Sequence, residues 1–224
     1  MARIKNGPYG PIVGRIGNTV GYIRLGQPVL RMTAHKSNKP RTIKQLGAQE
    51  IFSVVNSFIK VVNRFTNAGF KVKSKKFVGK TAQNMAMSAN LNQGVEGEYP
   101  DYRLNYPKIV LSEGKLPLPA SIAAGLDGGD LKFTWINEAP MENDMPMDQA
   151  MLLAYFPETG RASFTISGAR RSREEDTLDL FIPVKIGPNQ TRETFLEAYI
   201  AFISDDRESV SDSMYLGRIE LPVI

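Results

Sequence analysis

Residues 42–65 read TIKQLGAQEIFSVVNSFIKVVNRF and form the longest helical pattern in the chain. Apolar residues recur in it at alternating spacings of four and three, which places them along one side of an α-helix. The stripe residues are Ile51, Val55, Phe58, Val62 and Phe65, and the residues that widen the stripe are Phe52, Val54, Ile59 and Val61. This is more apolar coverage than an ordinary surface helix carries. The pattern predicts one helix that is covered on more than one side, by the rest of the chain or by another subunit.

The residues after this helix predict its end and the next two elements of the chain. Asn67 and Gly69 are typical of a helix end. Phe70–Lys76 then has the alternation of a short basic strand. Thr81 is a typical N-cap residue, and it predicts a second helix over Ala82–Gln93 that Gly94 closes.

Residues 1–41 contain too many glycines and prolines for a helix, so extended structure is expected there. Thr19–Arg24 and Pro28–Thr33 flank Leu25-Gly26-Gln27 and predict a β-hairpin. A two-stranded hairpin is marginally stable in water. We therefore expect the hairpin to lean on the long helix or on a neighbouring subunit.

From Lys108 onward the apolar periodicity changes to two, which indicates strands. The predicted strands are Lys108–Ser112, Leu131–Asn137, Ala150–Phe156, Arg161–Ser167, Thr177–Pro183, Phe195–Ser204 and Val210–Leu221. Seven short strands separated by turns are the number expected for an immunoglobulin-like sandwich, with Trp135, Ile200 and Phe202 in its core. The predicted class is thus α+β: residues 1–105 hold a basic, glycine-rich hairpin and two helices, and residues 106–224 hold the antiparallel sandwich.

Composition excludes several kinds of chemistry and compartment. The chain of 224 residues has no cysteine, which rules out disulfides, thiolate nucleophiles and cysteine-bound metals. The N-terminal residues MARIKNGPYGPIVG lack the apolar core of a signal peptide, and no run is long enough for a membrane span. We expect a cytoplasmic protein that can be incorporated into a larger particle.

Charge is distributed very unevenly along the chain. Residues 1–85 hold 16 lysines and arginines against the single acid Glu50, whereas the other 139 residues hold 12 basic and 22 acidic side chains. The first part therefore carries +15 and the second −10, which together give the net charge of +5. A segment of +15 is typical of polyanion binding, but beside a segment of −10 it also fits an electrostatic match between subunits.

Neither a catalytic constellation nor a cofactor motif stands out. His35 is the sole histidine and lies in a basic loop, where a solvated side chain is far commoner than a catalytic base. Asp127 and Asp130 flank two glycines. This sequence is typical of a turn, and a calcium site is the less favoured interpretation. In residues 170–176, RRSREED, three arginines are balanced by three acidic residues, which predicts a solvated hairpin loop. We expect a protein that is not an enzyme and needs no cofactor or metal.

Several segments resemble a known family. They are GPYGPIVGRIGNTVGYIRLGQPVLR (7–31), PRTIKQLGAQEIF (40–52), LSEGKLP (111–117), Trp135 and VSDSMYLG (210–217). Together they resemble an uncharacterised protein family of Bacteroidota, a domain of unknown function, over nearly the whole chain. The resemblance implies no activity and no catalytic residues.

Three classes of function remain open. The first is a structural subunit of a phage particle, tube or filament, in which the basic region of one copy contacts the acidic sandwich of the next. The second is a nucleic-acid-binding protein, with stacking by Tyr9, Tyr22, Phe70 and Phe77. The third is an adhesion or carbohydrate-binding sandwich. For the first two classes the expected contact residues are Arg15, Arg24, Arg31, Lys71, Lys73, Lys75 and Lys76.

Overall fold

The computed structural model of the chain forms two compact units. It describes residues 3–4, 10–35, 38–137, 145–180 and 193–222. The N-terminal unit comprises residues 1–42 with 77–79, and the main unit comprises 43–76 with 80–224. The division after Thr42 differs from the boundary expected between residues 105 and 106. Helices and strands therefore share one compact unit.

The N-terminal unit is a four-stranded antiparallel sheet in the order β1-β2-β3-β4. Its strands are β1 (Arg3–Ile4), β2 (Ile12–Ile16), β3 (Thr19–Arg24) and β4 (Gln27–Met32). The predicted hairpin is confirmed as β3 and β4, where Arg24 pairs with Gln27 across a two-residue turn. Leu25 and Gly26 in this turn have φ of 48° and 77°, as the favoured two-residue hairpin turns require.

Three helices begin the main unit: α1 (Ile43–Val61), α2 (Asn63–Lys75) and α3 (Ala82–Gln93). The single helix expected over 42–65 is interrupted at Val62, which has φ −93° and ψ 17°. The stop expected at Asn67 and Gly69 and the strand expected over Phe70–Lys76 are both wrong, because α2 continues to Lys75. The second helix is confirmed, with the Thr81 hydroxyl accepting a hydrogen bond from the Asn84 N–H at 3.2 Å. No helix among the described residues is long and apolar enough to cross a membrane.

Gly69 lies inside α2 because another segment of the chain packs directly against it. A Cβ at this position would lie 2.5 Å from the Leu111 carbonyl oxygen and 2.5 Å from the Ser112 Cβ. The Glu113 N–H also donates to the Gly69 carbonyl at 3.3 Å. Glycine is therefore required here for close approach and does not end the helix.

We expect Gly69→Ala to destabilise the main unit by about 1–3 kcal/mol, as overpacking of a core does. In an open helix the same change would stabilise by about 1 kcal/mol, so the sign of the effect tests the contact. Gly125→Ala in β7 (Ser121–Asp127) is the control, since its Cβ would meet nothing within 4 Å. Urea unfolding of both variants measures the difference, and a stabilised Gly69→Ala would contradict the packing described.

The rest of the main unit consists of antiparallel strands and short 3-10 turns. After β7 the strands are β8 (Asp130–Ile136), β9 (Gln149–Phe156), β10 (Arg161–Thr165), β11 (Glu175–Leu178), β12 (Phe195–Ile203) and β13 (Met214–Glu220), and before it lies the small pair β5 (Val95–Glu96) and β6 (Arg103–Leu104). The turns are η1 (Tyr106–Lys108), η2 (Met145–Met147) and η3 (Arg171–Arg173). One sheet has the order β10-β9-β12-β13 and the other β11-β8-β7.

Six of the seven expected strands have counterparts here, although residues 181–183 of one lie outside the described residues. The prediction of a strand over Lys108–Ser112 is wrong, because side chains, and not a neighbouring strand, accept the hydrogen bonds of its backbone N–H groups. The Val110 N–H donates to Asn90 Oδ1 at 2.8 Å, and the Leu111 N–H donates to Ser213 Oγ at 2.9 Å. Strand β7 was not expected, because its sequence SIAAGLD is rich in small residues with weak strand preference.

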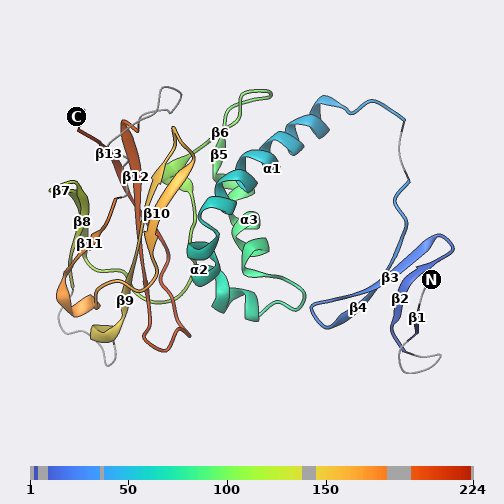
Figure 1. Cartoon of the computed structure of the whole chain (residues 1–224), viewed down its shortest axis with the longest axis horizontal. Coiled ribbons are helices and arrows are strands. Elements are labelled where there is room, and N and C mark those ends of the chain that lie inside the picture. The colour runs from blue at the N-terminus through green and yellow to red at the C-terminus, as the bar shows by residue number, and fades with distance from the viewer. Residues whose placement is uncertain (1–2, 5–9, 36–37, 138–144, 181–192, 223–224) are drawn as a thin grey trace. The chain divides into compact units, whose positions relative to one another are not determined.

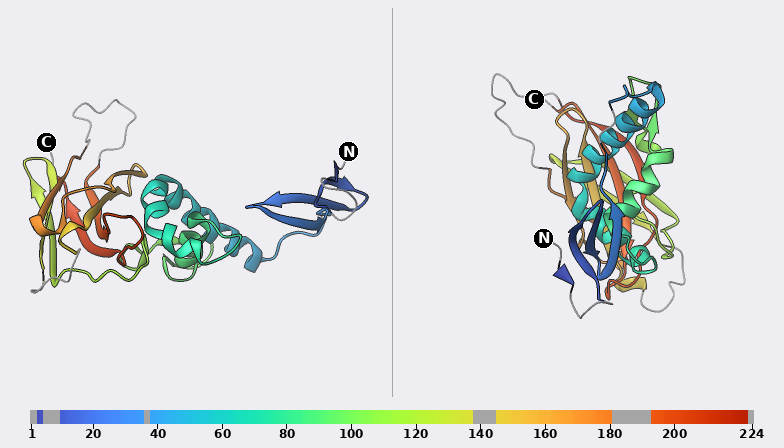
Figure 2. Two further views of the ribbon diagram at one scale, coloured as in Figure 1. Left: turned by 90° about the horizontal axis from the view of Figure 1, so that it is seen from below. Right: turned by 90° about the vertical axis from the view of Figure 1, so that its right-hand side faces the viewer.

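The four-stranded sheet of the main unit is covered on both faces (Figures 1 and 2). Helices α1–α3 pack on one face, where the Phe58 and Tyr155 rings meet edge to face with centroids 4.8 Å apart. The sheet β11-β8-β7 packs on the other, and Trp135, Ile200 and Phe202 are buried there as predicted. Most of the helical stripe is thus buried within the chain, although Phe52 remains 52% exposed. The fold is α+β with several antiparallel sheets; an immunoglobulin-like arrangement stays a prediction.

Candidate functional site

The three expected arginines of the N-terminal unit lie on one face of its sheet. Directly paired residues of antiparallel strands point to the same side, and Arg15 and Arg31 both pair with Val20. Arg24 follows Val20 and Tyr22 at alternate positions of β3, so it points the same way. The Arg31 guanidinium lies 5.9 Å from the centroid of the Tyr22 ring. We call Arg15, Arg24, Arg31 and Tyr22 the arginine face.

The opposite face of this sheet is apolar and largely exposed, although the Ile12 backbone covers it at Gly21. Thr19 pairs with both Ile16 and Met32, and Gly21 pairs with Leu30, so these side chains share a side with Ile23. We define the apolar face by its large side chains, with their exposed fractions: Ile16 (47%), Ile23 (47%), Leu30 (60%) and Met32 (66%). Four large side chains, each about half exposed or more, therefore lie on one side of a small sheet.

The N-terminal unit has almost no core of its own. Among its residues whose burial is described, only Gly21 is buried. A small sheet without a packed face is marginally stable in water. Its outer strand β4 contains Pro28, which supplies no N–H for a further strand. Contact through the faces is therefore favoured over strand addition at this edge.

The four expected lysines belong to the main unit, and two of them already contact acids of the same chain. Lys73 forms an ion pair with Glu113. Lys75 contacts Glu208, with Nζ 2.8 Å from the carboxylate. Lys71 and Lys76 are exposed; Lys71 lies within α2 and Lys76 just beyond its end. The seven expected contact residues thus divide between the two units.

The aromatic residues expected to stack on bases divide in the same way. Tyr22 lies on the arginine face, whereas Phe70 is fully buried against the sheet and cannot stack on a ligand. Phe77 is 44% exposed. Tyr9 lies outside the described residues.

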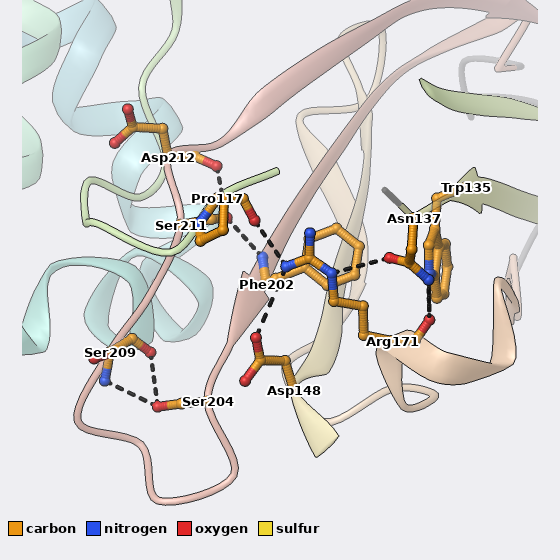
Figure 3. A network of polar contacts seen from close by, with 10 residues as sticks. All are labelled: Pro117, Trp135, Asn137, Asp148, Arg171, Phe202, Ser204, Ser209, Ser211 and Asp212. Carbon is orange, nitrogen blue, oxygen red and sulfur yellow. Dashed lines mark hydrogen bonds and ion pairs between the residues drawn. The ribbon is translucent and has the colours of Figure 1, made fainter. Parts of the chain in front are cut away.

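The loop expected over residues 170–176 contains a buried arginine that the sequence did not reveal (Figure 3). Arg171 is 2% exposed, so the expectation of a fully solvated loop is wrong. Its Nε donates to Asn137 Oδ1 at 3.0 Å, and its Nη1 donates to the Pro117 carbonyl at 2.7 Å and lies 3.8 Å from the Asp148 carboxylate. Burial lowers the pKa of Arg171, and the nearby Asp148 charge acts in the opposite direction.

Arg171 also joins the core of the two sheets. Its guanidinium lies 5.1 Å from the centroid of the Phe202 ring, and its carbonyl accepts a hydrogen bond from Trp135 Nε1 at 2.8 Å. Protein groups therefore surround both the side chain and the carbonyl. These hydrogen bonds connect η3 to β8 and to the segment around Pro117. They leave no room for a ligand at the guanidinium.

The other residues singled out in the sequence have local structural roles. Asp127 and Asp130 pair across the β7–β8 turn, and Asp130 Oδ1 accepts a hydrogen bond from the Leu180 N–H at 3.2 Å. His35 is exposed just after β4. Among the described residues, no group of three or more metal-binding side chains comes together.

Comparison with known proteins gives one match. No curated protein and no solved structure is detectably similar to the chain. A family model described as "Family of unknown function (DUF6266)" matches residues 11–217. This range begins just before β2 and ends within β13, so strands β2, β3 and β4 of the N-terminal sheet lie in the region that the family shares, and β1 lies outside it. The chain therefore belongs to the DUF6266 family, whose function is unknown.

Proposed function

We propose that the chain is a non-enzymatic structural subunit that assembles with further copies of itself through the N-terminal sheet. The observation that carries this proposal is the apolar face, with Ile16, Ile23, Leu30 and Met32 exposed together on one side. Covering a large apolar side chain completely stabilises by about 1.5–3 kcal/mol. Covering the remaining half of four such side chains would contribute about 3–6 kcal/mol to a contact between subunits.

The charge distribution supports a second copy of the chain as the partner that covers the apolar face. Residues 86–224 carry a net charge of −10, whereas the arginine face adds three positive charges on the N-terminal sheet. The arginine face lies on the opposite side of the sheet from the apolar face, so its charges accelerate the approach of the second copy at long range, and the apolar face makes the contact itself. Because Lys73 and Lys75 contact acids of their own chain, the arginines are the main candidates for this role.

The contact we propose is head-to-tail, from the N-terminal sheet of one copy to the acidic sandwich, residues 106–224, of the next. Such contacts close into rings or propagate as tubes and filaments, depending on the rotation between subunits. A phage particle, tube or filament is the corresponding biological setting. We further propose that the main unit's two packed sheets are an immunoglobulin-like sandwich. The orders β11-β8-β7 and β10-β9-β12-β13 support this, since they correspond to strands E-B-A and C′-C-F-G.

The test is light scattering after size-exclusion chromatography on nucleic-acid-free protein. We expect the wild type to form an oligomer that persists in high salt, since apolar contact is not screened. The variant Leu30→Asp/Met32→Asp places two charges on the apolar face. It should weaken association by about 2 kcal/mol or more, as loss of central interface residues does.

The matched control is Leu25→Asp, which adds a charge in the turn of the same hairpin but outside the apolar face. Leu25 is 56% exposed and has positive φ, a conformation that aspartate tolerates. The control should assemble like the wild type. A wild type that stays monomeric at every concentration, or a control that dissociates as much as the double variant, would refute the proposal.

Nucleic-acid binding is the second candidate, because the arginine face combines three cations with an aromatic ring. Arg15, Arg24 and Arg31 lie on the same face as Tyr22, and such surfaces bind single strands by backbone contacts and stacking. The triple variant Arg15→Gln/Arg24→Gln/Arg31→Gln separates the two functions. If it assembles at the normal rate but loses binding to single-stranded DNA or RNA, the arginine face serves nucleic acid.

A further inference from the structure

A polar cavity of about 670 Å³ lies in the main unit, where β5, β6 and η1 meet β12 and β13. This volume falls within the roughly 300–1,000 Å³ of small-molecule sites. The side chains that matter for the argument are Glu96, Arg103, Tyr106, Glu197, Tyr215 and Arg218. The cavity belongs to the main unit alone, so it is independent of the N-terminal sheet and of the assembly proposed above.

Glu197 is the unexpected residue of this cavity. It lies in β12, an interior strand whose residues from Leu196 to Ile203 are all buried, and its side chain is only 1% exposed. The other seven residues of that stretch are apolar. An apolar residue at such a position is usually as stabilising as a buried ion pair, or more so. Glu197 therefore requires an explanation other than the stability of the sheet.

The contacts of Glu197 provide that explanation, because they hold Arg218 in place. Its Oε1 accepts hydrogen bonds from Arg218 Nε at 3.0 Å and Nη2 at 2.9 Å, and its Oε2 accepts one from the Tyr215 hydroxyl at 2.6 Å. The Arg218 guanidinium also lies 3.9 Å from the centroid of the Phe195 ring. Arg218 is thus fixed by a carboxylate and an aromatic ring, although its side chain remains 50% exposed at the cavity.

This arrangement leaves hydrogen-bond donors for a ligand. A guanidinium has five N–H groups, and among the described residues Arg218 Nη1 has no hydrogen-bond partner. Arg103 lines the same cavity and has no ion-pair partner in the described part of the chain. An arginine fixed in advance by a buried carboxylate loses little side-chain entropy when it binds a planar anionic group.

Of the two tyrosines in the cavity lining, Tyr106 adds a neutral donor, whereas Tyr215 donates its hydroxyl proton to Glu197. Burial, with the nearby Tyr155 and Glu197, raises the pKa of Tyr106 to about 12. Burial and the hydrogen bond to Glu197 raise the pKa of Tyr215 as well. Both hydroxyls therefore stay protonated at neutral pH and do not repel an anion.

We propose that this cavity binds a small molecule through an oxyanion group, carboxylate or phosphate, held by Arg103 and Arg218. The negative charge of Glu197 is directed to Arg218 and Tyr215. Glu96 lies opposite Arg103 in the β5–β6 pair, and its Oε2 accepts a hydrogen bond from Asn105 at 2.7 Å. Its carboxylate limits the affinity for anions and favours ligands that also carry a hydrogen-bond donor.

The experiment is isothermal titration of the whole protein with citrate and with pyrophosphate, at constant ionic strength. Citrate tests carboxylate and pyrophosphate tests phosphate, and saturable binding of either supports the site. Arg103→Gln should weaken that binding about tenfold or more, since it removes a charged donor. Glu96→Gln should strengthen it. Arg103 and Glu96 are both exposed residues of a short strand pair, so neither change disturbs the core.

The matched control is Arg64→Gln, which removes the same charge from an exposed position on α2, outside the cavity lining. The affinity of this variant for citrate or pyrophosphate should equal that of the wild type. An equal loss in Arg64→Gln and Arg103→Gln would mean general attraction of anions to a basic chain and would overturn the site. The absence of saturable binding of both probes to the wild type would overturn it too, whatever the state of assembly.

Discussion

Replacement of Trp135 by alanine is expected to lower the free energy of unfolding by about 3–5 kcal/mol, as other large-to-small changes in cores do. Trp135 is 2% exposed, and its ring meets that of Phe202 edge to face with centroids 5.4 Å apart. The change removes this packing and leaves a cavity between the two sheets. It also removes the Nε1 donor to the Arg171 carbonyl, so two contributions are lost together.

Urea unfolding followed by far-UV circular dichroism measures this effect, since Trp135 is the sole tryptophan and the variant has no tryptophan fluorescence. The control is Ile136→Ala, the next residue of β8, which is 63% exposed. Exposed substitutions of this kind change stability by about 0.5 kcal/mol or less. A cost below about 1 kcal/mol for Trp135→Ala would contradict its place in the core.

Arg171→Met is the second large effect, with an expected loss of about 3–5 kcal/mol. Methionine fills much of the same volume but leaves the buried Asp148 without the cation beside it and removes the donors to Asn137 and Pro117. Breaking a buried pair is costly because the remaining charge stays away from water. Adding Asp148→Asn should therefore restore part of the lost stability.

Arg173→Met is the control, because Arg173 lies on the same 3-10 turn but is exposed. It should unfold at nearly the wild-type urea concentration. If Arg171→Met and Arg173→Met are equally mild, the network of Figure 3 does not stabilise the fold. If Asp148→Asn gives no recovery, the loss comes from the hydrogen bonds to Asn137 and Pro117 and not from the charge.

Local patterns in the sequence predicted the elements whose signals are themselves local. The hairpin β3–β4 follows from alternation around Leu25-Gly26, and α3 follows from its caps Thr81 and Gly94. The burial of Trp135, Ile200 and Phe202 follows from period-two patterning. In each case a few neighbouring residues determine the outcome, and tertiary contacts agree with them.

The missed features depend on contacts between distant segments. Gly69 looked like a helix end because nothing near it in sequence reveals that Leu111 and Ser112 pack on it. Arg171 looked solvated because acids follow it in sequence, whereas its partners Asn137 and Pro117 lie far away. Glu197 gave no signal, since its partner Arg218 is on another strand.

Only part of the candidate interaction surface was predicted from the sequence. Arg15, Arg24 and Arg31 were expected to make contacts, but their common face depends on the register that the Leu25-Gly26 turn sets. Counting alternate positions outward from that turn would have separated the arginines from Ile23, Leu30 and Met32. The ion pairs of Lys73 and Lys75 could not be found this way, because their acids are distant in sequence.

Burial of the four-stranded sheet on both faces has a consequence for folding during synthesis. Helices α1–α3 leave the ribosome first, but β12, which completes the surface they pack on, is made about 100 residues later. At about 5–20 residues per second, this interval lasts roughly 5–20 s. During that time the apolar stripe with Val55, Phe58 and Phe65 lacks the complete sheet that covers it, so we expect the nascent protein to bind chaperones.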